Sequence, residues 1–319
     1  MDDTPLEKID IMVPTHGKLN LSIECVDTIY QNTTHPFHLI VVDDSPSETD
    51  ATVAYFERFC KTHKSCTFVH SDKPYKCGNQ FFNIAIANMQ TKYLATVMNS
   101  MKVESEWEIE AIKLMNSDPK IGCIGFKCLF PDTHKIECAG IELYNGYMPI
   151  DIGRDLPGHA LTKIYEVKAI QWAFALLRKE AVQGNLTEGV FAGFKGWDDI
   201  DNCFVLKTRG WKIFYCGFGV GIHHPRATRG DNSADAYLKN KANAHAFFKR
   251  WGLWNNYMES KKMDVSDKVS AEMKRDISAV LTEFQMCKLL FESRNRTLQM
   301  LVKQVLEKEL KVDPEKYTM

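Results

Sequence analysis

The stretch that decides the fold is residues 32–48, which read NTTHPFHLIVVDDSPSE. Its apolar run, HLIVV at residues 38–42, ends abruptly at Asp43, Asp44 and Ser45. A short apolar run bounded by turn-forming residues is typical of a strand that is buried on both faces, as in a parallel sheet. The polar residues then mark the carboxyl end of that strand, which is the edge where parallel sheets bind ligands. Turn formation and helix capping are the alternative explanation for the two aspartates.

Strand and helix patterns alternate on both sides of this stretch over the first hundred residues. Strict alternation favours βαβ units and a doubly wound parallel sheet. The predicted strands are residues 9–13, 38–42, 66–69 and 93–97, and the predicted helices are residues 19–30, 51–59 and 79–89. Four segments follow strand ends at the expected ligand-binding edge, namely residues 14–17, 43–45, 72–78 and 98–101.

Two later sections differ from this pattern. Residues 121–221 mix short apolar runs with Gly- and Pro-rich connections and contain the acidic cluster GWDDID at residues 196–201. This mixture suits a substrate-facing half that continues the first half. After about residue 260 the pattern is a Lys/Glu-rich helix with an apolar stripe, which we expect to pack on the preceding domain or to form a homodimer. Acidic residues interrupt its basic face, which argues against a membrane-surface helix.

Composition excludes several classes of protein. The chain has 319 residues, a formal net charge of -1 and 45% hydrophobic residues, so it is neither disordered nor fibrous. This balance gives no overall field that would attract nucleic acid or an anionic membrane. The acidic amino terminus does not resemble a signal peptide, and no apolar stretch approaches the roughly 20 residues of a membrane span. The ten cysteines contain no CxxC pair, so we expect reduced thiols in a cytoplasmic protein.

Several further motifs follow one another in a meaningful order. They are IMVPTHGKLN (residues 11–20), NTTHPFHLIVVDDSPSE (32–48), GNQFFNIAIANMQTKYLATVMNS (78–100), IGCIGFKCLFPDTHKIECAGIEL (121–143), IQWAFALLRKEAV (170–182) and GWDDIDNCFVLKTRGWKIFYCGFGVGIHH (196–224). Together they resemble the family 2 glycosyltransferases, and most closely the rhamnosyltransferase-like branch. Enzymes of this family have the GT-A fold and move a sugar from a nucleotide diphosphate to an acceptor hydroxyl.

The resemblance runs from Ile9 to about Gly252 and implies an architecture. That architecture is an α/β fold of GT-A type, a Rossmann-like doubly wound mixed sheet followed by a C-terminal helical extension. The implied catalytic domain covers residues 1–255, with a nucleotide-binding half at about 1–105 and an acceptor half at about 106–255. Residues 256–319 form the expected extension.

The resemblance also implies a nucleotide-binding site. In the family, the second aspartate of the strand-end motif hydrogen-bonds the base, which points here to Asp44, with Asp43 beside it. A carboxylate at the end of a strand is well placed to accept from a base N–H and a ribose hydroxyl. The start of the following helix can accommodate phosphate. The other expected nucleotide-sugar contacts are Pro14, Thr15, Lys76, Gly78, Asn79, Asn99 and Ser100.

Asp199 aligns with the catalytic base of the inverting members of the family. Direct displacement at the anomeric carbon needs such a group, because the acceptor hydroxyl must lose its proton as it attacks. Asp198 stands where many relatives carry Glu and is expected to share in catalysis, while Asp201 holds the local structure in place. Trp197 either stacks on the acceptor sugar or lies in the core. A solvated acidic loop is the alternative for the aspartates.

The sequence departs from the family at its metal-binding motif. Where relatives have a DXD motif, this chain has Asn99, Ser100 and Met101. The Mg²⁺ or Mn²⁺ that the family implies prefers hard oxygen ligands, and a thioether is a poor ligand for either ion. His223 or His224 matches the late histidine that completes metal coordination or contacts the diphosphate, unless these are packing or surface histidines. Lys76, Arg226 and Arg229 would add positive charge.

Three functional hypotheses follow. The first is an active inverting glycosyltransferase that uses a UDP-, GDP- or dTDP-sugar with Asp199 as general base. It depends on metal weakly or not at all, or it holds the ion mainly through the diphosphate, Asn99 and a histidine. The second is an inactive GT-A pseudoenzyme that binds a nucleotide sugar or a partner. The third is a different reaction in the same pocket, such as nucleotidyl transfer. Expected acceptors are a saccharide, a lipid-linked saccharide, a protein, or modified bases in viral DNA. For DNA the only candidate surface is the basic segment at residues 239–254, which also fits a helix closing the fold.

Overall fold

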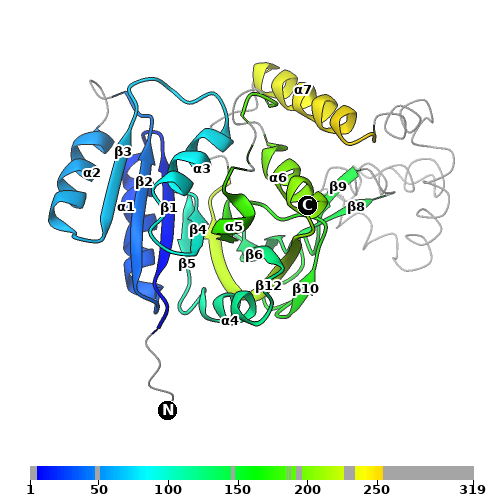
Figure 1. Cartoon of the computed structure of the whole chain (residues 1–319), viewed down its shortest axis with the longest axis horizontal. Coiled ribbons are helices and arrows are strands. Elements are labelled where there is room, and N and C mark those ends of the chain that lie inside the picture. Colours follow the sequence, from blue (N-terminus) through cyan, green and yellow to red (C-terminus); the bar gives the residue numbers. More distant parts are fainter. Residues whose placement is uncertain are drawn as a thin grey trace, which may run out of the picture. The chain divides into compact units, whose positions relative to one another are not determined.

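The apolar runs of the amino-terminal half form neighbouring parallel strands of one sheet (Figure 1). The computed structural model describes residues 6–46, 51–144, 148–184, 186, 188–191, 196–225 and 234–253. The strands of this half are β1 (Ile9–Thr15), β2 (Phe37–Asp43), β3 (Cys66–His70) and β4 (Tyr93–Val97), and its helices are α1 (Leu19–Asn32), α2 (Ala51–Thr62) and α3 (Gly78–Ala87). The predicted alternation of strand and helix is therefore confirmed. The expected extension at residues 256–319 lies outside the described residues, so its helical structure and the possible homodimer stay predictions.

Strand β1 is longer than its apolar run, because it continues through Pro14 to Thr15. Pro14 is paired in register with Val42 of β2, and Thr15 with Asp43. On the other side, the register between β1 and β4 ends at Met12. A proline is tolerated near the end of a strand, where ladder hydrogen bonds are no longer needed on both sides. The extension matters because it brings Thr15 level with Asp43.

The carboxyl-terminal half turns the parallel sheet into a mixed one. The strand order is β10-β12-β6-β11-β4-β1-β2-β3, with β5 paired to β12 and β7 paired to β6. Strand β11 is antiparallel to both β4 and β6, so the sheet is mixed at its centre, as predicted. The elements of this half are β5 (Met101–Val103), α4 (Ile109–Ser117), β6 (Ile121–Leu129), β7 (Ile136–Cys138), β8 (Ile141–Tyr144), β9 (Met148–Asp151), β10 (Ile164–Glu166), β11 (Phe174–Arg178), α5 (Lys179–Val182), α6 (Asp198–Thr208), β12 (Lys212–His223) and α7 (Ala234–Arg250).

Two apolar cores lie on opposite faces of the sheet. Met12 and Ile40, which are register partners, pack with residues of α3 on one face, while Ile11 and Leu39 pack with residues of α1 on the other. All four side chains are fully buried. Successive side chains of a strand point to opposite faces, so a strand buried on both faces must be apolar throughout. This explains the continuous run that defined the fold in the sequence.

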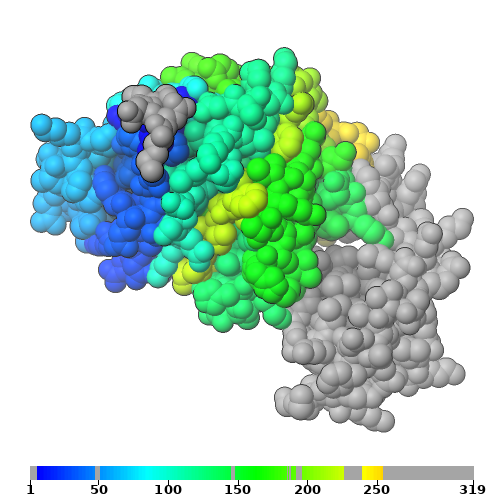
Figure 2. Space-filling model, turned by 90° about the horizontal axis from the view of Figure 1, so that it is seen from below, coloured from blue at the N-terminus to red at the C-terminus, as the bar shows by residue number. Residues whose placement is uncertain are grey.

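Strand β12 pairs with β6 on both sides of an irregularity between Cys216 and Val220. Its other neighbour changes along the strand, from β10 before the irregularity to β5 after it. Gly219 is required at the irregularity, because a Cβ atom there would clash with the carbonyl oxygen of Trp107. In Figure 2 the yellow-green residues of this region reach the surface between neighbouring segments, and Phe218 is 49% exposed. Beyond the irregularity the strand ends at His223, the register partner of Met101 in β5.

The cysteines require one correction. In the structure Cys60 and Cys66 form a disulfide, whereas the sequence predicted reduced thiols throughout. The end of α2 and the start of β3 bring their Cα atoms to 4.9 Å, which is a normal distance for a disulfide. The spacing of these two cysteines in the sequence matches no redox motif, so the sequence motifs did not predict the disulfide. Seven other cysteines are free and buried, as expected, namely Cys25, Cys77, Cys123, Cys128, Cys138, Cys203 and Cys216. Cys287 lies outside the described residues.

Each helix within the described ranges is too short or too polar to span a lipid bilayer.

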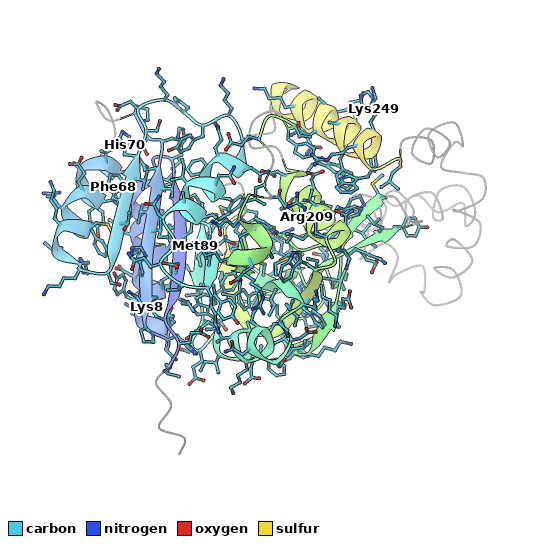
Figure 3. All side chains as sticks on the ribbon, in the orientation of Figure 1. Lys8, Phe68, His70, Met89, Arg209 and Lys249 are labelled. Carbon is cyan, nitrogen blue, oxygen red and sulfur yellow. A yellow bond between two sulfur atoms is a disulfide. The ribbon has the colours of Figure 1, made fainter. Side chains whose placement is uncertain are left out.

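The buried carboxylate of Asp10 forms hydrogen bonds near the amino ends of the strands. Asp10 accepts hydrogen bonds from the backbone of Gln90 and Thr91 at 3.0 and 2.8 Å, from the Thr91 hydroxyl at 2.7 Å, and from His38 Nδ1 at 2.7 Å. Its side chain is fully buried. Lys8, close to it in sequence, and His70 lie toward opposite ends of the strands in Figure 3.

We predict that Asp10→Ala lowers the free energy of unfolding by about 3 kcal/mol, because it leaves several buried donors without a partner. Chemical denaturation measures the change. The control is Glu110→Ala, which removes an exposed ion pair with Lys113 and should cost less than about 1 kcal/mol. Equal losses in the two variants would contradict this account of Asp10.

Candidate functional site

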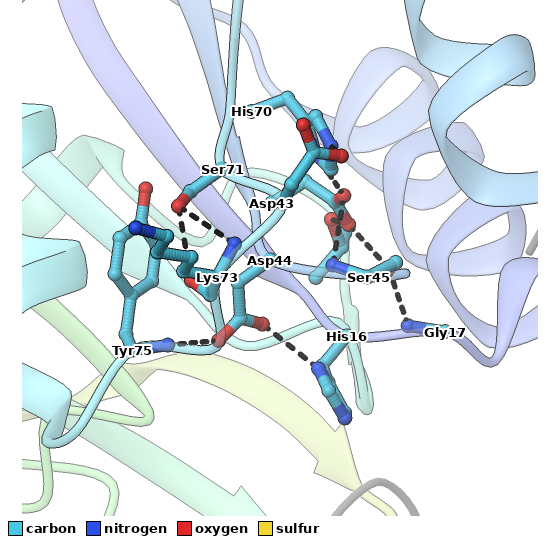
Figure 4. Close-up of polar contacts among 11 residues, drawn as sticks. His16, Gly17, Asp43, Asp44, Ser45, His70, Ser71, Lys73 and Tyr75 are labelled. Atoms are coloured by element: carbon cyan, nitrogen blue, oxygen red, sulfur yellow. Dashed lines mark hydrogen bonds and ion pairs between the residues drawn. The ribbon is translucent and has the colours of Figure 1, made fainter. Parts of the chain in front are cut away.

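The carboxyl ends of β1, β2 and β3 meet at the carboxylate of Asp43 (Figure 4). Thr15 Oγ1 donates to Asp43 Oδ2 at 2.5 Å, and His70 Nδ1 lies 2.9 Å from Oδ1. The backbone N–H and hydroxyl of Ser45 donate to the same carboxylate at 3.0 and 2.7 Å. Asp43 is fully buried. Its oxygens therefore bind the three strand ends together, which fits the turn-forming role that the sequence left open.

Asp44 faces a different set of groups. Its Oδ1 lies 2.9 Å from His16 Nδ1, and its Oδ2 accepts the backbone N–H of Tyr75 at 2.7 Å. Each carboxylate oxygen has two lone pairs, so each keeps acceptor capacity for a further donor. His16 is 52% exposed, whereas Asp44 is buried.

Tyr75 lines the same position through its backbone and its ring. Its ring packs edge-on against Phe81 of α3, with a centroid distance of 4.6 Å. Burial, and then the nearby charge of Asp44, raises the pKa of the Tyr75 phenol. The neighbouring Lys76 is exposed, and its backbone N–H donates to Gln80 Oε1 at 2.5 Å. The loop 71–77 thus brings an aromatic ring and a cation to the edge of the sheet.

The start of α3 faces α6 directly. A Cβ atom on Gly78 would lie 2.2 Å from Asp198 Oδ2, so the two helix starts are in close contact. Asn79 Nδ2 donates to Asn202 Oδ1 at 3.1 Å, and Asn202 Nδ2 donates back to Asn79 Oδ1 at 2.7 Å. The structure thus brings Gly78 and Asn79, predicted as nucleotide contacts, together with the acidic segment.

The acidic segment forms the first turn of α6. Asp198 and Asp201 are buried, which rules out a fully solvated loop for them, and Asp199 is more exposed than either. Arg250 Nη1 lies 3.3 Å from Asp201 Oδ2, which fits the predicted structural role of Asp201. Asp199 Oδ1 accepts the backbone N–H of Ile200 at 2.9 Å. The positive end of the helix dipole favours the ionised carboxylates at this position.

Trp197 precedes this turn in a strained conformation. Its φ is 80°, in the left-handed region that bulky residues rarely adopt. Its ring packs against Phe247 and Phe248 of α7, with centroid distances of 5.3 and 5.4 Å. The side chain is partly buried. Strained residues of this kind cluster at functional sites.

Residues 99–101, which were expected at the position of the family's DXD motif, follow the end of β4. Asn99 is 4% exposed and donates from Nδ2 to Ser22 Oγ at 3.1 Å. Met101 is fully buried in the core, where it is the register partner of His223 across β5 and β12. The backbone N–H of His224 donates to the Ser100 carbonyl at 2.9 Å. The predicted late histidines therefore do lie beside this segment.

Glu137 is a site residue that the sequence analysis did not single out. Its Oε2 lies 2.6 Å from His223 Nδ1, and both side chains are largely buried, at 7% and 13% exposure. Glu137 is on β7, which pairs with the same end of β6 as the last residues of β12. A carboxylate bound to one ring nitrogen fixes the orientation and tautomer of a histidine. A charged residue inside the apolar IEC segment was the signal available in the sequence.

Comparisons with known proteins agree with this geometry. Residues 10–125 match the model of the family described as Glycosyl transferase family 2. An uncharacterized protein of Sinorhizobium fredii, y4gI, is 26% identical over 240 residues, which cover 72% of this chain. The match covers 26% of that relative's own length. The chain thus spans about a quarter of this longer protein.

Two solved structures have a similar architecture. One is GalNAc-T7 with UDP, GalNAc and Mn²⁺, with a TM-score of 0.61 and 13% identity over 87% of this chain and 55% of that one. The other is the mannosyltransferase PcManGT from Pyrobaculum calidifontis in complex with GDP-Man and Mn²⁺, with a TM-score of 0.51 and 16% identity over 97% of this chain and 90% of that one. The chain has the GT-A fold. The residues that match the family model include Asp44, Asn79 and Asn99.

The Mn²⁺ in these two structures raises the question of a metal site here. The described residues contain no group of three His, Cys, Asp or Glu side chains placed to hold a metal ion. The Asn99 amide donates to Ser22, Met101 is turned into the core, and one nitrogen of His223 is bound to Glu137. Divalent Mn²⁺ or Mg²⁺ favours several hard oxygen ligands. The residues at this position do not fit such an ion.

His70 generates a pH-dependent prediction. Burial lowers the pKa of its imidazole, but hydrogen bonds to Asp72 and Asp43 and the charges of both carboxylates outweigh burial, so the net pKa is raised. A raised folded-state pKa contributes stability that is fully present below the unfolded-state pKa and is lost as the pH rises through the folded-state pKa.

We therefore expect His70→Gln to destabilise the protein more at pH 5.5 than at pH 9, as measured by urea denaturation at both values. His159→Gln, at an exposed position, is the control and should show no such difference. A loss for His70→Gln that is the same at both pH values would contradict the role of its charge.

Proposed function

We propose that the protein is an inverting glycosyltransferase that moves a sugar from a nucleotide diphosphate sugar to an acceptor hydroxyl. One observation carries the proposal. At the carboxyl edge of a GT-A sheet, Asp44 keeps acceptor capacity near a solvent-exposed His16, while the α6 turn that bears Asp199 touches the start of α3. A base-recognition carboxylate and a candidate general base are thus held on adjoining elements.

In the proposed reaction the nucleotide base donates a hydrogen bond to Asp44. Asp199 accepts the proton of the acceptor hydroxyl as its oxygen attacks the anomeric carbon. The new carbon–oxygen bond forms as the bond to the diphosphate breaks, and the electron pair leaves with the diphosphate. A single displacement of this kind inverts the configuration at the anomeric carbon. The donor is a UDP-, GDP- or dTDP-sugar, since each of these bases offers an N–H group.

The leaving diphosphate needs positive charge in this scheme. We assign this role to His223 and His224 beside Asn99 and Ser100, with the exposed Lys76 as a further cation. No step depends on a metal ion, because the residues that replace the DXD motif do not fit one. Arg226 and Arg229, which were also expected to contribute, lie outside the described residues.

The proposed base predicts the effect of a conservative substitution. We expect Asp199→Asn to lower kcat by about 10²–10⁴-fold, because the acceptor proton has no acceptor, while the dissociation constant of the nucleotide stays unchanged. Steady-state transfer assays and calorimetry with the nucleotide measure the two quantities. Asp27→Asn, on the exposed face of α1, is the control. Turnover at the wild-type rate in Asp199→Asn would remove Asp199 from this role.

Metal dependence separates the proposal from its closest alternative. We expect transfer to continue at the same rate in EDTA, and Mn²⁺ to have no large effect, when the purified protein is assayed with a panel of UDP-, GDP- and dTDP-sugars. Loss of activity in EDTA that Mn²⁺ restores would show that the site holds a cation after all.

Binding of a donor without hydrolysis or transfer would favour a pseudoenzyme, which the missing DXD carboxylates also support.

For the acceptor of the sugar we propose only classes of molecule. A saccharide, a lipid-linked saccharide, a protein side chain or a modified base in viral DNA would each supply the attacking hydroxyl. The exposed positions of α7 include Lys241 and Lys249, and this helix packs on Trp197 beside the candidate base. Figure 3 shows Lys249 on that helix. This arrangement favours acceptors that carry negative charge.

A further inference from the structure

A reciprocal pair of amides joins two helices that are far apart in the sequence. Asn79 and Asn202 are separated by 123 residues, and each donates to the other, at 3.1 and 2.7 Å. Each of the two side chains is 1% exposed. A buried amide pair of this kind has strict directional requirements, whereas an apolar contact tolerates sliding and rotation. The pair therefore fixes how α3 and α6 face each other.

The two helices contact each other at two successive points. The Gly78 backbone meets the Asp198 carboxylate, and one residue further along α3, Asn79 meets Asn202. Asp198 and Asn202 are four residues apart, so they lie on the same face of α6 and turn that face toward α3. Asp199 follows Asp198 by one residue, which places it about 100° around the helix. The direction of the Asp199 side chain thus follows from the contacts of its two neighbours.

The start of α6 has a strained backbone conformation, which contacts with α7 and α3 stabilise. Trp197 enters α6 with a φ of 80°, and Gly196 before it has a φ of 81°. From the side of α7, Phe247 and Phe248 pack on the Trp197 ring, and Asn243 Nδ2 donates to the Gly196 carbonyl at 3.4 Å. A strained entry persists only where the surroundings determine it from several sides. The amide pair supplies the constraint from the side of α3.

Helix α3 is in turn linked to Asp44 at the end of β2. It follows the loop 71–77, in which the backbone N–H of Tyr75 donates to Asp44. The chain therefore connects Asp44, Tyr75 and the start of α3 within a few residues. A contact between α3 and α6 transmits the position of the base-recognition carboxylate to the acidic turn.

We infer that Asn79 and Asn202 are positioning residues that set the direction of the Asp199 carboxylate relative to the bound nucleotide. The inference rests on the proposed function, in which Asp199 is the general base. It assigns Asn79 a role in catalysis through α6, in place of the direct nucleotide contact that the sequence predicted. Gly78 belongs to the same arrangement, because only a residue without a side chain allows the Asp198 carboxylate so close.

The test is a double variant, Asn79→Leu with Asn202→Leu. Leucine has nearly the shape of asparagine, and replacing both partners of a buried hydrogen bond by apolar groups of similar shape changes stability little. The directional bonds are lost, however. We expect kcat for transfer to fall by about 10–100-fold, with the donor KM, the nucleotide dissociation constant and the melting temperature close to wild type.

A matched control is available on the same helix. Asn83→Leu removes hydrogen bonds from α3 to the Leu186 carbonyl and to Glu188, at 3.4 and 2.7 Å, without touching α6. It should leave kcat unchanged. If the double variant does not fold, Gly78→Ala tests the second contact between α3 and α6, because the added methyl group displaces the Asp198 carboxylate. This variant should lower kcat with little change in nucleotide affinity.

The possible results distinguish a failure of the positioning role from a failure of the proposed function. Wild-type kcat in the folded double variant, or in Gly78→Ala, would show that the amide pair only stabilises the fold and would overturn the positioning role. An absence of turnover in the wild-type protein with every donor would overturn the proposed function and the positioning role with it. A fall in kcat together with an equal loss of nucleotide affinity would assign Asn79 to nucleotide binding and would also overturn the inference.

Discussion

The carboxylate of Asp43 is the interaction on which the candidate site depends. It binds Thr15, Ser45 and His70 at the ends of three parallel strands, so these ends cannot separate without leaving a buried charge unpaired. With Asp43 engaged in this way, the next residue, Asp44, is left to face the ligand edge of the sheet. Asp43 thus stabilises this edge of the sheet, and Asp44 is the residue that we propose binds the base.

The contact between α3 and α6 connects this edge of the sheet to the carboxyl-terminal half of the domain. The Gly78–Asp198 and Asn79–Asn202 contacts join α6, which bears Asp199, to α3, which follows the loop whose Tyr75 donates to Asp44. A transferase must hold donor and acceptor in a fixed relation, because displacement needs the attacking oxygen and the leaving group on opposite sides of one carbon. Buried polar contacts are suited to this purpose, since they specify direction as well as distance.

Local patterns in the sequence predicted much of this fold and little of its tertiary pairing. Continuous apolar runs gave the strands of the first half, and the helices between them lie where helical spacing placed them. The resemblance to a family led to Asp44 and to the acidic turn. By contrast, the partners Asn202 and Glu137 lie 123 and 86 residues from the side chains they bind, and no local spacing encodes such contacts. The Cys60–Cys66 disulfide was missed because its formation depends on how α2 meets β3.

A crystal structure of the protein with the nucleotide sugar that it turns over, soaked in the presence of EDTA, tests this account most directly. We predict that an N–H group of the base lies within hydrogen-bonding distance of Asp44. The diphosphate should lie beside Asn99 and His223, and the Asp199 carboxylate should face the open side of the anomeric carbon. A nucleotide bound away from Asp44, or an Asp199 side chain that points away from the sugar while the Asn79–Asn202 pair is intact, would contradict the account.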